Sequence, residues 1–244
     1  MNTLPKAILF DLDETIISFG SRRLILQAVI EEFADLFAPV TPEDAGVVME
    51  TGFRRFWSDE ARAAIWRQDL GAGRILAVEE GFAELRPQSP GLSADFARIF
   101  GERFHVYREQ QAKFFPGALE TIQAFRELGV KLALVTNGAA EPQRAKVERF
   151  NLAPLFDHVQ IEGEAGFGKP QEQAYVHAMQ ILGVQPHETW MVGDNLEWEV
   201  AAPQRLGIYA IWHDHLGEGL PPGSSVRPDR IVQSIAELNP RARD

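Results

Sequence analysis

The sequence predicts an α/β fold, in which a mainly parallel sheet has helices on both faces and carries an inserted all-helical domain. Three observations predict this fold. An apolar run at residues 6–10 stops at two carboxylates, only helical patterns follow between about residues 18 and 112, and helix and strand patterns alternate after Pro116. The chain has 244 residues, of which 45% are hydrophobic, so it is long enough to bury such a core.

The first predicted strand is the run Lys6-Ala7-Ile8-Leu9-Phe10. Its four consecutive apolar residues suit a parallel strand that is covered on both faces. Asp11 and Asp13 come directly after it, spaced two residues apart. Ligands of open α/β sheets bind just beyond the carboxyl ends of the strands, so the chemistry is expected where this run ends.

A helical insert is expected over residues 18–112, between core segments 1–17 and 113–244. Apolar residues recur there at intervals of three and four, which is typical of amphipathic helices. Ser93 is a suitable N-cap for the last helix. The helical patterns lie at residues 24–37, 53–57, 61–70 and 93–107. The insert should therefore hold four or five helices and no strand.

Regular alternation predicts βα units after Pro116. The predicted strands lie at residues 130–135, 158–161, 189–192, 208–212 and 230–232. A helix at 118–128 precedes the first of them, and helices at 142–150 and 174–182 lie between later ones. Thr136 and Asn137 follow one strand, Lys169 lies in the loop after the next, and Asp194 follows a third. Polar side chains thus gather at successive strand ends.

These strand-end residues suit one reaction. A carboxylate such as Asp11 can attack phosphorus, and a second carboxylate two residues on can move the proton of the leaving group. Mg²⁺ held by oxygen ligands would lower the repulsion between Asp11 and a phosphate. A lysine and a hydroxyl would complete the phosphate site.

In order and spacing, the motifs resemble those of the haloacid dehalogenase superfamily of aspartate-nucleophile phosphatases and phosphomutases. The four motifs stand here as Asp11-Leu12-Asp13-Glu14-Thr15, Leu132-Ala133-Leu134-Val135-Thr136-Asn137-Gly138, Gly168-Lys169-Pro170 and Gly193-Asp194-Asn195-Leu196-Glu197-Trp198-Glu199. The resemblance covers residues 1–17 and about 113–244, together with the position of the insert. It implies a Rossmann-like core and a helical cap domain.

The resemblance also implies roles for these residues. Asp11 would form the aspartyl-phosphate and bind Mg²⁺, with the backbone carbonyl of Asp13 and the side chain of Asp194 as further ligands. Asp13 would be the general acid and base. Three further groups would hold the transferring phosphoryl oxygens, where charge must be stabilised: Thr136, the Asn137 backbone and Lys169.

Asp13 distinguishes two branches of the family. Dehalogenases of this superfamily lack the second aspartate, because a halide leaving group needs no proton. The presence of Asp13 therefore points to phosphate chemistry.

Two positions depart from the family pattern. Glu199 stands where the last acid of the fourth motif is normally aspartate, and its extra methylene changes its reach by about one carbon–carbon bond. It could bind Mg²⁺ directly, act through a water, or leave Glu197 or a water to complete the octahedral shell. Pro203 lies where a helix should still run, so a kink or early stop is expected there.

Composition excludes several classes of protein. The formal charge of −11 would repel a nucleic-acid backbone, and no apolar segment approaches the length of a membrane span. The chain has no cysteine, which fits a reducing compartment, and the cytoplasm is the expected location. His213-Asp214-His215 lacks an evident third metal ligand nearby, so a second metal site is not expected.

The function predicted from the sequence is that of a Mg²⁺-dependent phosphatase for a small phosphorylated metabolite. The first alternative is a phosphosugar mutase like β-phosphoglucomutase, which uses the same motifs. Such a mutase needs a phospho-enzyme that resists hydrolysis until a sugar accepts the phosphoryl group. The second is a catalytically idle binding protein with this fold. A halide-releasing enzyme is a further alternative, against which Asp13 argues.

Overall fold

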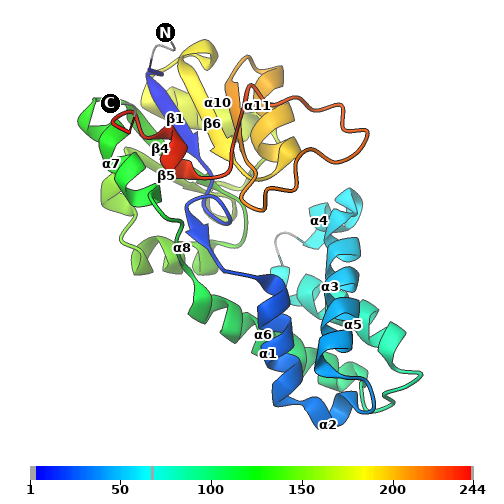
Figure 1. Cartoon of the computed structure of the whole chain (residues 1–244). Helices are drawn as coiled ribbons and strands as arrows, with labels where there is room; N and C mark the ends of the chain where they lie inside the picture. Colours follow the sequence, from blue (N-terminus) through cyan, green and yellow to red (C-terminus); the bar gives the residue numbers. More distant parts are fainter. Residues whose placement is uncertain (1–3, 67–68, 243–244) are drawn as a thin grey trace. The chain divides into compact units, whose positions relative to one another are not determined.

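A computed structural model describes residues 4–66 and 69–242 and divides into two compact units (Figure 1). The α/β unit comprises Met1–Ser18 and Lys113–Asp244, and the helical unit comprises Phe19–Ala112. No helix among the described residues is long and apolar enough to cross a membrane.

The α/β unit is built on a six-stranded sheet, which confirms the predicted fold class. The strands are β1 (Ala7–Phe10), β4 (Lys131–Thr136), β5 (His158–Ile161), β6 (Thr189–Gly193), β7 (Tyr209–His213) and β8 (Arg230–Val232). Their spatial order is β5-β4-β1-β6-β7-β8, and all neighbours are parallel. The chain continues from β1 to β4 and β5 on one side and then crosses to β6, β7 and β8 on the other, so the sheet has its topological switch point beside β1.

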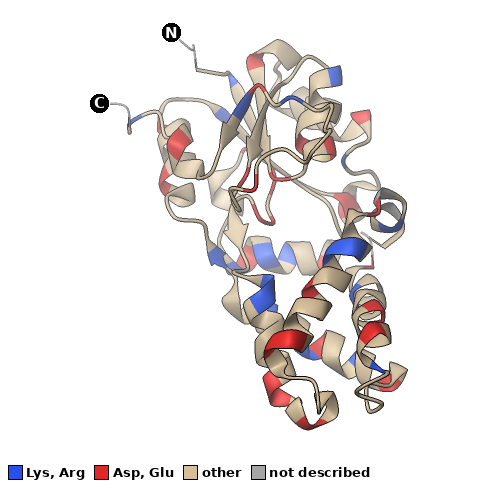
Figure 2. Cartoon of the chain, turned by 45° about the vertical axis from the view of Figure 1, so that its right-hand side comes forward, with Lys and Arg blue, Asp and Glu red and all other residues tan. Residues whose placement is uncertain are grey.

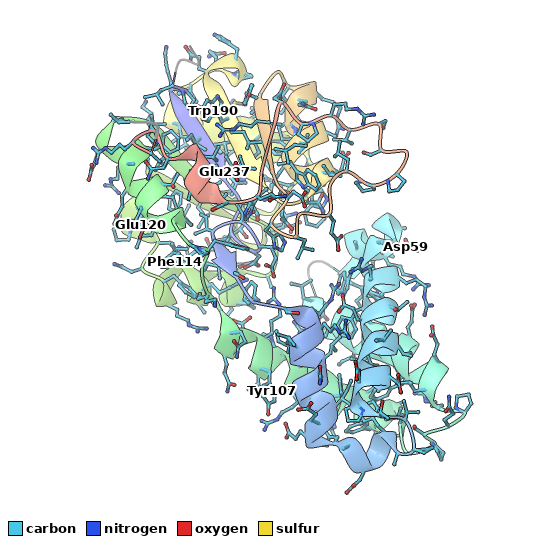
Figure 3. All side chains as sticks on the ribbon, viewed as in Figure 1. Asp59, Tyr107, Phe114, Glu120, Trp190 and Glu237 are labelled. Carbon is cyan, nitrogen blue, oxygen red and sulfur yellow. The ribbon has the colours of Figure 1, made fainter. Side chains whose placement is uncertain are left out.

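Helices cover both faces of the sheet because its strands are apolar on both sides. Ala7 and Leu9 of β1 belong to a core cluster with Tyr175 and Ala178 of α10 (Glu172–Leu182). On the other face, the ring of Phe125 in α7 (Ala118–Glu127) contacts that of Trp190 in β6, at 6.2 Å between centroids (Figure 3). Burying β1 in this way fixes its last residue, and with it the position of Asp11.

Two further helices connect strands of the sheet. Helix α8 (Ala140–Arg149) follows β4. The short helix α9 (Glu162–Ala165) lies within the stretch that was predicted as a plain loop, because a single helical turn is too short to show periodicity.

The helical segment after Asp194 changes its winding before Pro203. Residues Leu196–Ala201 form a π-helical turn, and α11 (Ala202–Arg205) follows with the proline in its first turn. The winding thus changes one residue before the proline, which cannot donate the hydrogen bond of a continuous helix. A kink or early stop was expected at Pro203, and the helical segment runs two residues past it before it ends at Arg205.

A second, two-stranded sheet pairs the segments at which the chain leaves and re-enters the α/β unit. Strand β2 (Ile17–Ser18) runs antiparallel to β3 (Lys113–Phe114), with Ile17 opposite Phe114 (labelled in Figure 3). Two-residue strands carry no readable alternation, so the sequence did not predict this sheet.

The described part of the helical unit contains six helices, more than the four or five expected. They are α1 (Arg22–Glu32), α2 (Ala34–Phe37), α3 (Pro42–Ser58), α4 (Glu60–Trp66), α5 (Leu70–Leu85) and α6 (Ala94–Gln111). The pattern at 24–37 is broken at Phe33, and that at 61–70 is divided between α4 and α5, with residues 67–68 outside the described part. Ser93 is the N-cap of α6, as predicted, and accepts the N–H of Phe96 at 3.1 Å.

Aromatic side chains fill the core of the helical unit. The rings of Phe82 and Phe96 stack at 5.5 Å, and Phe37 and Phe100 pack around them. At its surface, Tyr107 of α6 (labelled in Figure 3) donates a hydrogen bond to Glu32 of α1 at 3.1 Å. The unit therefore has its own apolar core.

Candidate active site

The polar residues predicted from the sequence lie at the carboxyl ends of three adjacent strands. Asp11 follows β1, Thr136 ends β4, and Asp194 follows β6. Figure 2 shows acidic segments gathered at this end of the sheet. The switch point of a parallel sheet is where such folds bind their ligands, so this is the candidate active site.

Asp11 is held in a fixed orientation at this point. Its backbone N–H donates to the Val192 carbonyl at 3.0 Å, and its Oδ2 accepts the hydroxyl of Thr15 at 3.1 Å. Its Oδ1 lies 2.5 Å from the Nζ of Lys169. Its side chain is 10% exposed, so little of this carboxylate is covered by water.

Lys169 is completely buried between two carboxylates. Its Nζ lies 2.5 Å from Asp11 and 2.7 Å from Glu199 Oε1. Burial alone would lower the pKa of Lys169, but the charges of Asp11 and Glu199 raise it above its usual value. Lys169 therefore stays an ammonium that can neutralise an anion at Asp11.

Asn137 fixes the backbone that carries this lysine. Its Nδ2 donates to the Lys169 carbonyl at 2.7 Å, and its Oδ1 accepts the Lys169 N–H at 2.8 Å. The side-chain amide thus satisfies both backbone groups of Lys169. The sequence predicted a role for the Asn137 backbone, and the structure adds this one for its side chain.

Thr136 is buried at the last position of β4, and its hydroxyl lies 3.4 Å from the Asn137 carbonyl. Gly138, two residues after Thr136, donates its N–H to the buried carboxylate of Glu162 at 3.0 Å. Strand β4 therefore ends in a hydroxyl on a loop whose path is fixed by hydrogen bonds.

Glu199 contacts Lys169 and its own helical turn. Its Oε2 accepts the Asn195 N–H at 2.8 Å, while Oε1 faces Lys169. Burial raises the pKa of Glu199 to about 7, with Lys169 opposing the shift and Asp11 adding to it. Glu197, the other candidate acid, pairs with Arg205 at 2.7 Å on the surface.

Asp13 points to a different set of partners from Asp11. Lys146 Nζ lies 2.7 Å from its Oδ1, and Gln143 Nε2 lies 3.1 Å from its Oδ2. The two aspartates of the first motif are thus held by separate groups, which suits them to separate tasks.

The charges at this site suit a divalent cation. Burial raises the pKa of Asp194 well above its usual value, and the nearby carboxylates of Glu199, Asp11 and Glu14 raise it further. Asp11 and Glu199 share Lys169, and Asp194 adds a further carboxylate near them, so negative charge is in excess. In the described residues no three His, Cys, Asp or Glu side chains surround a common point. The predicted ligand set needs only two carboxylate side chains plus a backbone carbonyl, and oxygen donors of this kind fit Mg²⁺.

Comparison with known proteins agrees with this geometry. The family model described as haloacid dehalogenase-like hydrolase matches residues 5–207. The phosphoserine phosphatase of Thermus thermophilus is 31% identical over 252 residues, which cover 96% of this chain and 97% of that protein. This chain belongs to the haloacid dehalogenase-like hydrolases. It is therefore an enzyme of the hydrolase class.

Solved structures of the family share the fold. The HAD hydrolase YfnB of Bacillus subtilis, solved with bound magnesium, has a TM-score of 0.73 at 20% identity and covers 97% of both chains. A 2-haloacid dehalogenase of Pseudomonas syringae has a TM-score of 0.56 at 23% identity and covers 96% of both chains. The same fold thus occurs in a HAD hydrolase and in a dehalogenase, so the fold alone does not specify the reaction.

Three residues that support this hydrolase site were not predicted from the sequence: Gln143, Lys146 and Glu162. All three are polar and buried. Gln143 and Lys146 carry a weak sequence signal, because they are three residues apart and share the inward side of α8 with Val147. A polar pair on the buried side of a predicted helix indicates a buried partner.

His213 has a structural contact in this hydrolase. Its Nδ1 lies 3.0 Å from the carbonyl oxygen of Glu14, the residue after Asp13. Burial lowers the pKa of His213 to about 4. Asp214 accepts the backbone N–H groups of Glu218 and Gly219 at 3.2 and 2.9 Å. His213 therefore supports the loop of the first motif as a neutral side chain.

Proposed function

We propose that this hydrolase is a Mg²⁺-dependent phosphatase that acts on a small phosphorylated metabolite through an aspartyl-phosphate intermediate. The observation that carries the proposal is the contact of 2.5 Å between Asp11 and the buried ammonium of Lys169, with a second carboxylate, Asp13, held apart from it. One group is thus available as nucleophile and the other as proton shuttle.

In the first step, an Asp11 oxygen forms a bond to phosphorus and the bond from phosphorus to the leaving oxygen breaks. The leaving oxygen keeps the electron pair and takes a proton from Asp13, so an alcohol departs. Lys169, Thr136 and the Asn137 backbone hold the phosphoryl oxygens during this step.

In the second step, water attacks the phosphorus of the aspartyl-phosphate. Its proton passes to Asp13, the bond from phosphorus to Asp11 breaks, and inorganic phosphate leaves. Asp11 is again a carboxylate and Asp13 again a carboxylic acid, so the enzyme is ready for the next substrate.

Mg²⁺ would be held by the side chains of Asp11 and Asp194 and the backbone carbonyl of Asp13. When bound, it would lower the repulsion between Asp11 and the phosphate. Glu199 stays a predicted further ligand, although its contacts with Lys169 and Asn195 support a different role.

Two observations support a small phosphorylated metabolite as the substrate. Asp13 supplies the proton that an alkoxide needs and a halide does not. The whole-length relative named above is a phosphatase of a small metabolite. The proposal places the enzyme in the cytoplasm, with a phosphorylated substrate and with neither a membrane nor a nucleic acid as partner. The helical insert, predicted over residues 18–112, would serve as the cap domain that selects the metabolite.

A screen of phosphate monoesters tests the proposal. Protein incubated with Mg²⁺ should release inorganic phosphate from at least one member of a broad panel, and Asp11→Asn should abolish the release while the protein stays folded. Absence of release across the panel, or substantial activity of Asp11→Asn, would contradict it. A chloride assay on haloacids tests the halide alternative, and comparison of water with a sugar as phosphoryl acceptor tests the mutase alternative.

A further inference from the structure

We propose that Lys146 and Gln143 are positioning residues that hold the Asp13 carboxylate for the water step of the reaction. This inference rests on the proposed function. Both residues lie on α8, three positions apart, and neither belongs to a strand end.

Their contacts with Asp13 reach both of its oxygens. Lys146 Nζ lies 2.7 Å from Oδ1 and also bonds Oδ2, and Gln143 Nε2 lies 3.1 Å from Oδ2. A carboxylate with one donor can rotate about its last bond, whereas donors on both oxygens hold its plane. The orientation of Asp13 is therefore set from α8.

The two positioning residues are themselves immobilised by burial. Lys146 is 8% exposed and Gln143 is 3% exposed. A buried ammonium needs a partner, because its charge is strongly destabilising when it is left unpaired away from water. Lys146 is thus tied to Asp13 more firmly than a surface lysine would be.

Gln143 also connects Asp13 to the loop that follows β4. Its Nε2 lies 2.6 Å from the Asn137 carbonyl, in addition to its contact with Asp13. Gly138 has a φ of +120°, and a Cβ there would lie only 3.0 Å from Gln143 Nε2. Glycine at this position leaves room for the amide. The proton shuttle and the phosphate-holding loop are therefore fixed to each other.

This arrangement suits the step in which Asp13 accepts a proton. Each carboxylate oxygen has two lone pairs, so an oxygen that accepts a bond from Lys146 can also accept a proton from water. The water oxygen bonds to phosphorus, the bond to Asp11 breaks, and the proton goes to Asp13. Without the positioning residues, the carboxylate can turn away from the water and this step slows.

Steady-state kinetics with p-nitrophenyl phosphate separates the water step from the first step. p-Nitrophenolate leaves without a proton, so aspartyl-phosphate formation, measured by kcat/KM, does not need Asp13 as an acid. Lys146→Met should lower kcat by about 10-fold or more, part of the 10²–10⁴ that general acid–base catalysis supplies. KM should fall in parallel, and kcat/KM should stay within about 2-fold of the wild-type value.

Three variants and one direct measurement complete the test. Lys146→Arg keeps donors for Asp13 and should recover part of kcat. Gln143→Leu should show the same parallel fall of kcat and KM, but a smaller one, and it replaces Lys146→Met as the test variant if that protein does not fold. Lys131→Met is the matched control, since Lys131 Nζ donates to the Leu182 carbonyl at 2.5 Å instead. The intact mass of acid-quenched Lys146→Met should show accumulated phosphoprotein during turnover.

Two results would overturn the inference while leaving the proposed function standing. One is an equal loss in kcat and kcat/KM with KM unchanged, which indicates damage to the first step or to the fold. The other is wild-type kinetics in both Lys146→Met and Gln143→Leu. A wild-type protein that releases no phosphate from any monoester would instead overturn the proposed function, and this inference with it.

Discussion

Lys169 and Glu199 form a buried ion pair, with 2.7 Å between Nζ and Oε1 and side chains that are 0% and 1% exposed. The same ammonium also faces Asp11, so Glu199 and the proposed nucleophile share it. A buried pair of this kind adds little net stability, but removal of one partner strongly destabilises the fold because the other charge is left unpaired. We therefore expect Glu199 to position Lys169 in the site.

Glu199→Asp should weaken catalysis although aspartate is the usual residue of the family. The shorter side chain reaches about 1.5 Å less far. It can no longer contact both Lys169 and the Asn195 N–H. We expect kcat for phosphate release to fall about 10-fold or more, as when a group that stabilises transition-state charge is displaced. Glu127→Asp, at an exposed pair with Arg241, is the control, and equal activity of the two variants would contradict the role.

Asn137→Asp should misplace the same lysine through its backbone. The substitution keeps the acceptor for the Lys169 N–H but replaces the Nδ2 donor with an oxygen that repels the Lys169 carbonyl. Loss of one such hydrogen bond costs about 1–3 kcal/mol when the group stays buried. We expect a lower free energy of unfolding and a lower kcat.

Thermal unfolding and phosphate release measure the two effects. Asn151→Asp is a matched control outside the site, since Asn151 lies in the turn after α8. Unchanged stability of Asn137→Asp would show that the amide does not hold Lys169.

The six-stranded sheet and the polar residues at its strand ends could be predicted from the sequence for a physical reason. Strand β1 is apolar throughout, and β4 is apolar between Lys131 and Thr136, so the strand ends are marked where Asp11 and Thr136 begin the polar segments. The partners of Asp13 could not be read in this way. They depend on how α8 packs against a strand end more than 120 positions earlier in the chain, and its periodicity indicates only which residues face inward.

Protonation of His213 should destabilise the α/β unit at acidic pH. Burial lowers the pKa of His213 from 6.5 to about 4, so the unfolded chain binds the proton more readily than the folded one. The contribution of this group to stability is complete above pH 6.5 and is lost as the pH falls toward 4. A shift of this size corresponds to roughly 3 kcal/mol.

Denaturant unfolding of His213→Asn across this pH window checks the expectation. The Asn amide can donate to the Glu14 carbonyl as Nδ1 does but does not titrate there. The difference between wild type and variant should therefore shrink as the pH falls. The exposed His187→Asn should show a constant difference, and a constant difference for both variants would contradict the prediction.

Mg²⁺ should stabilise the protein against unfolding. A ligand that binds only the folded state adds about 2.7 kcal/mol at a concentration of 100 Kd. Asp194→Asn removes one proposed carboxylate ligand and should reduce the increase in Tm caused by Mg²⁺. Addition of a chelator should reverse the increase in the wild type. An equal increase in Tm for Asp194→Asn would exclude Asp194 as a ligand.

The pairing of β2 with β3 has a consequence for the modularity of the chain. Ser18 lies opposite Lys113, so the polypeptide departs from the α/β unit and returns to it at neighbouring positions. Everything between these residues could be exchanged for another segment without altering the strand order or moving Asp11. Chimeras joined at this two-stranded junction should thus keep the six-stranded sheet and Asp11 whichever segment is inserted between Ser18 and Lys113.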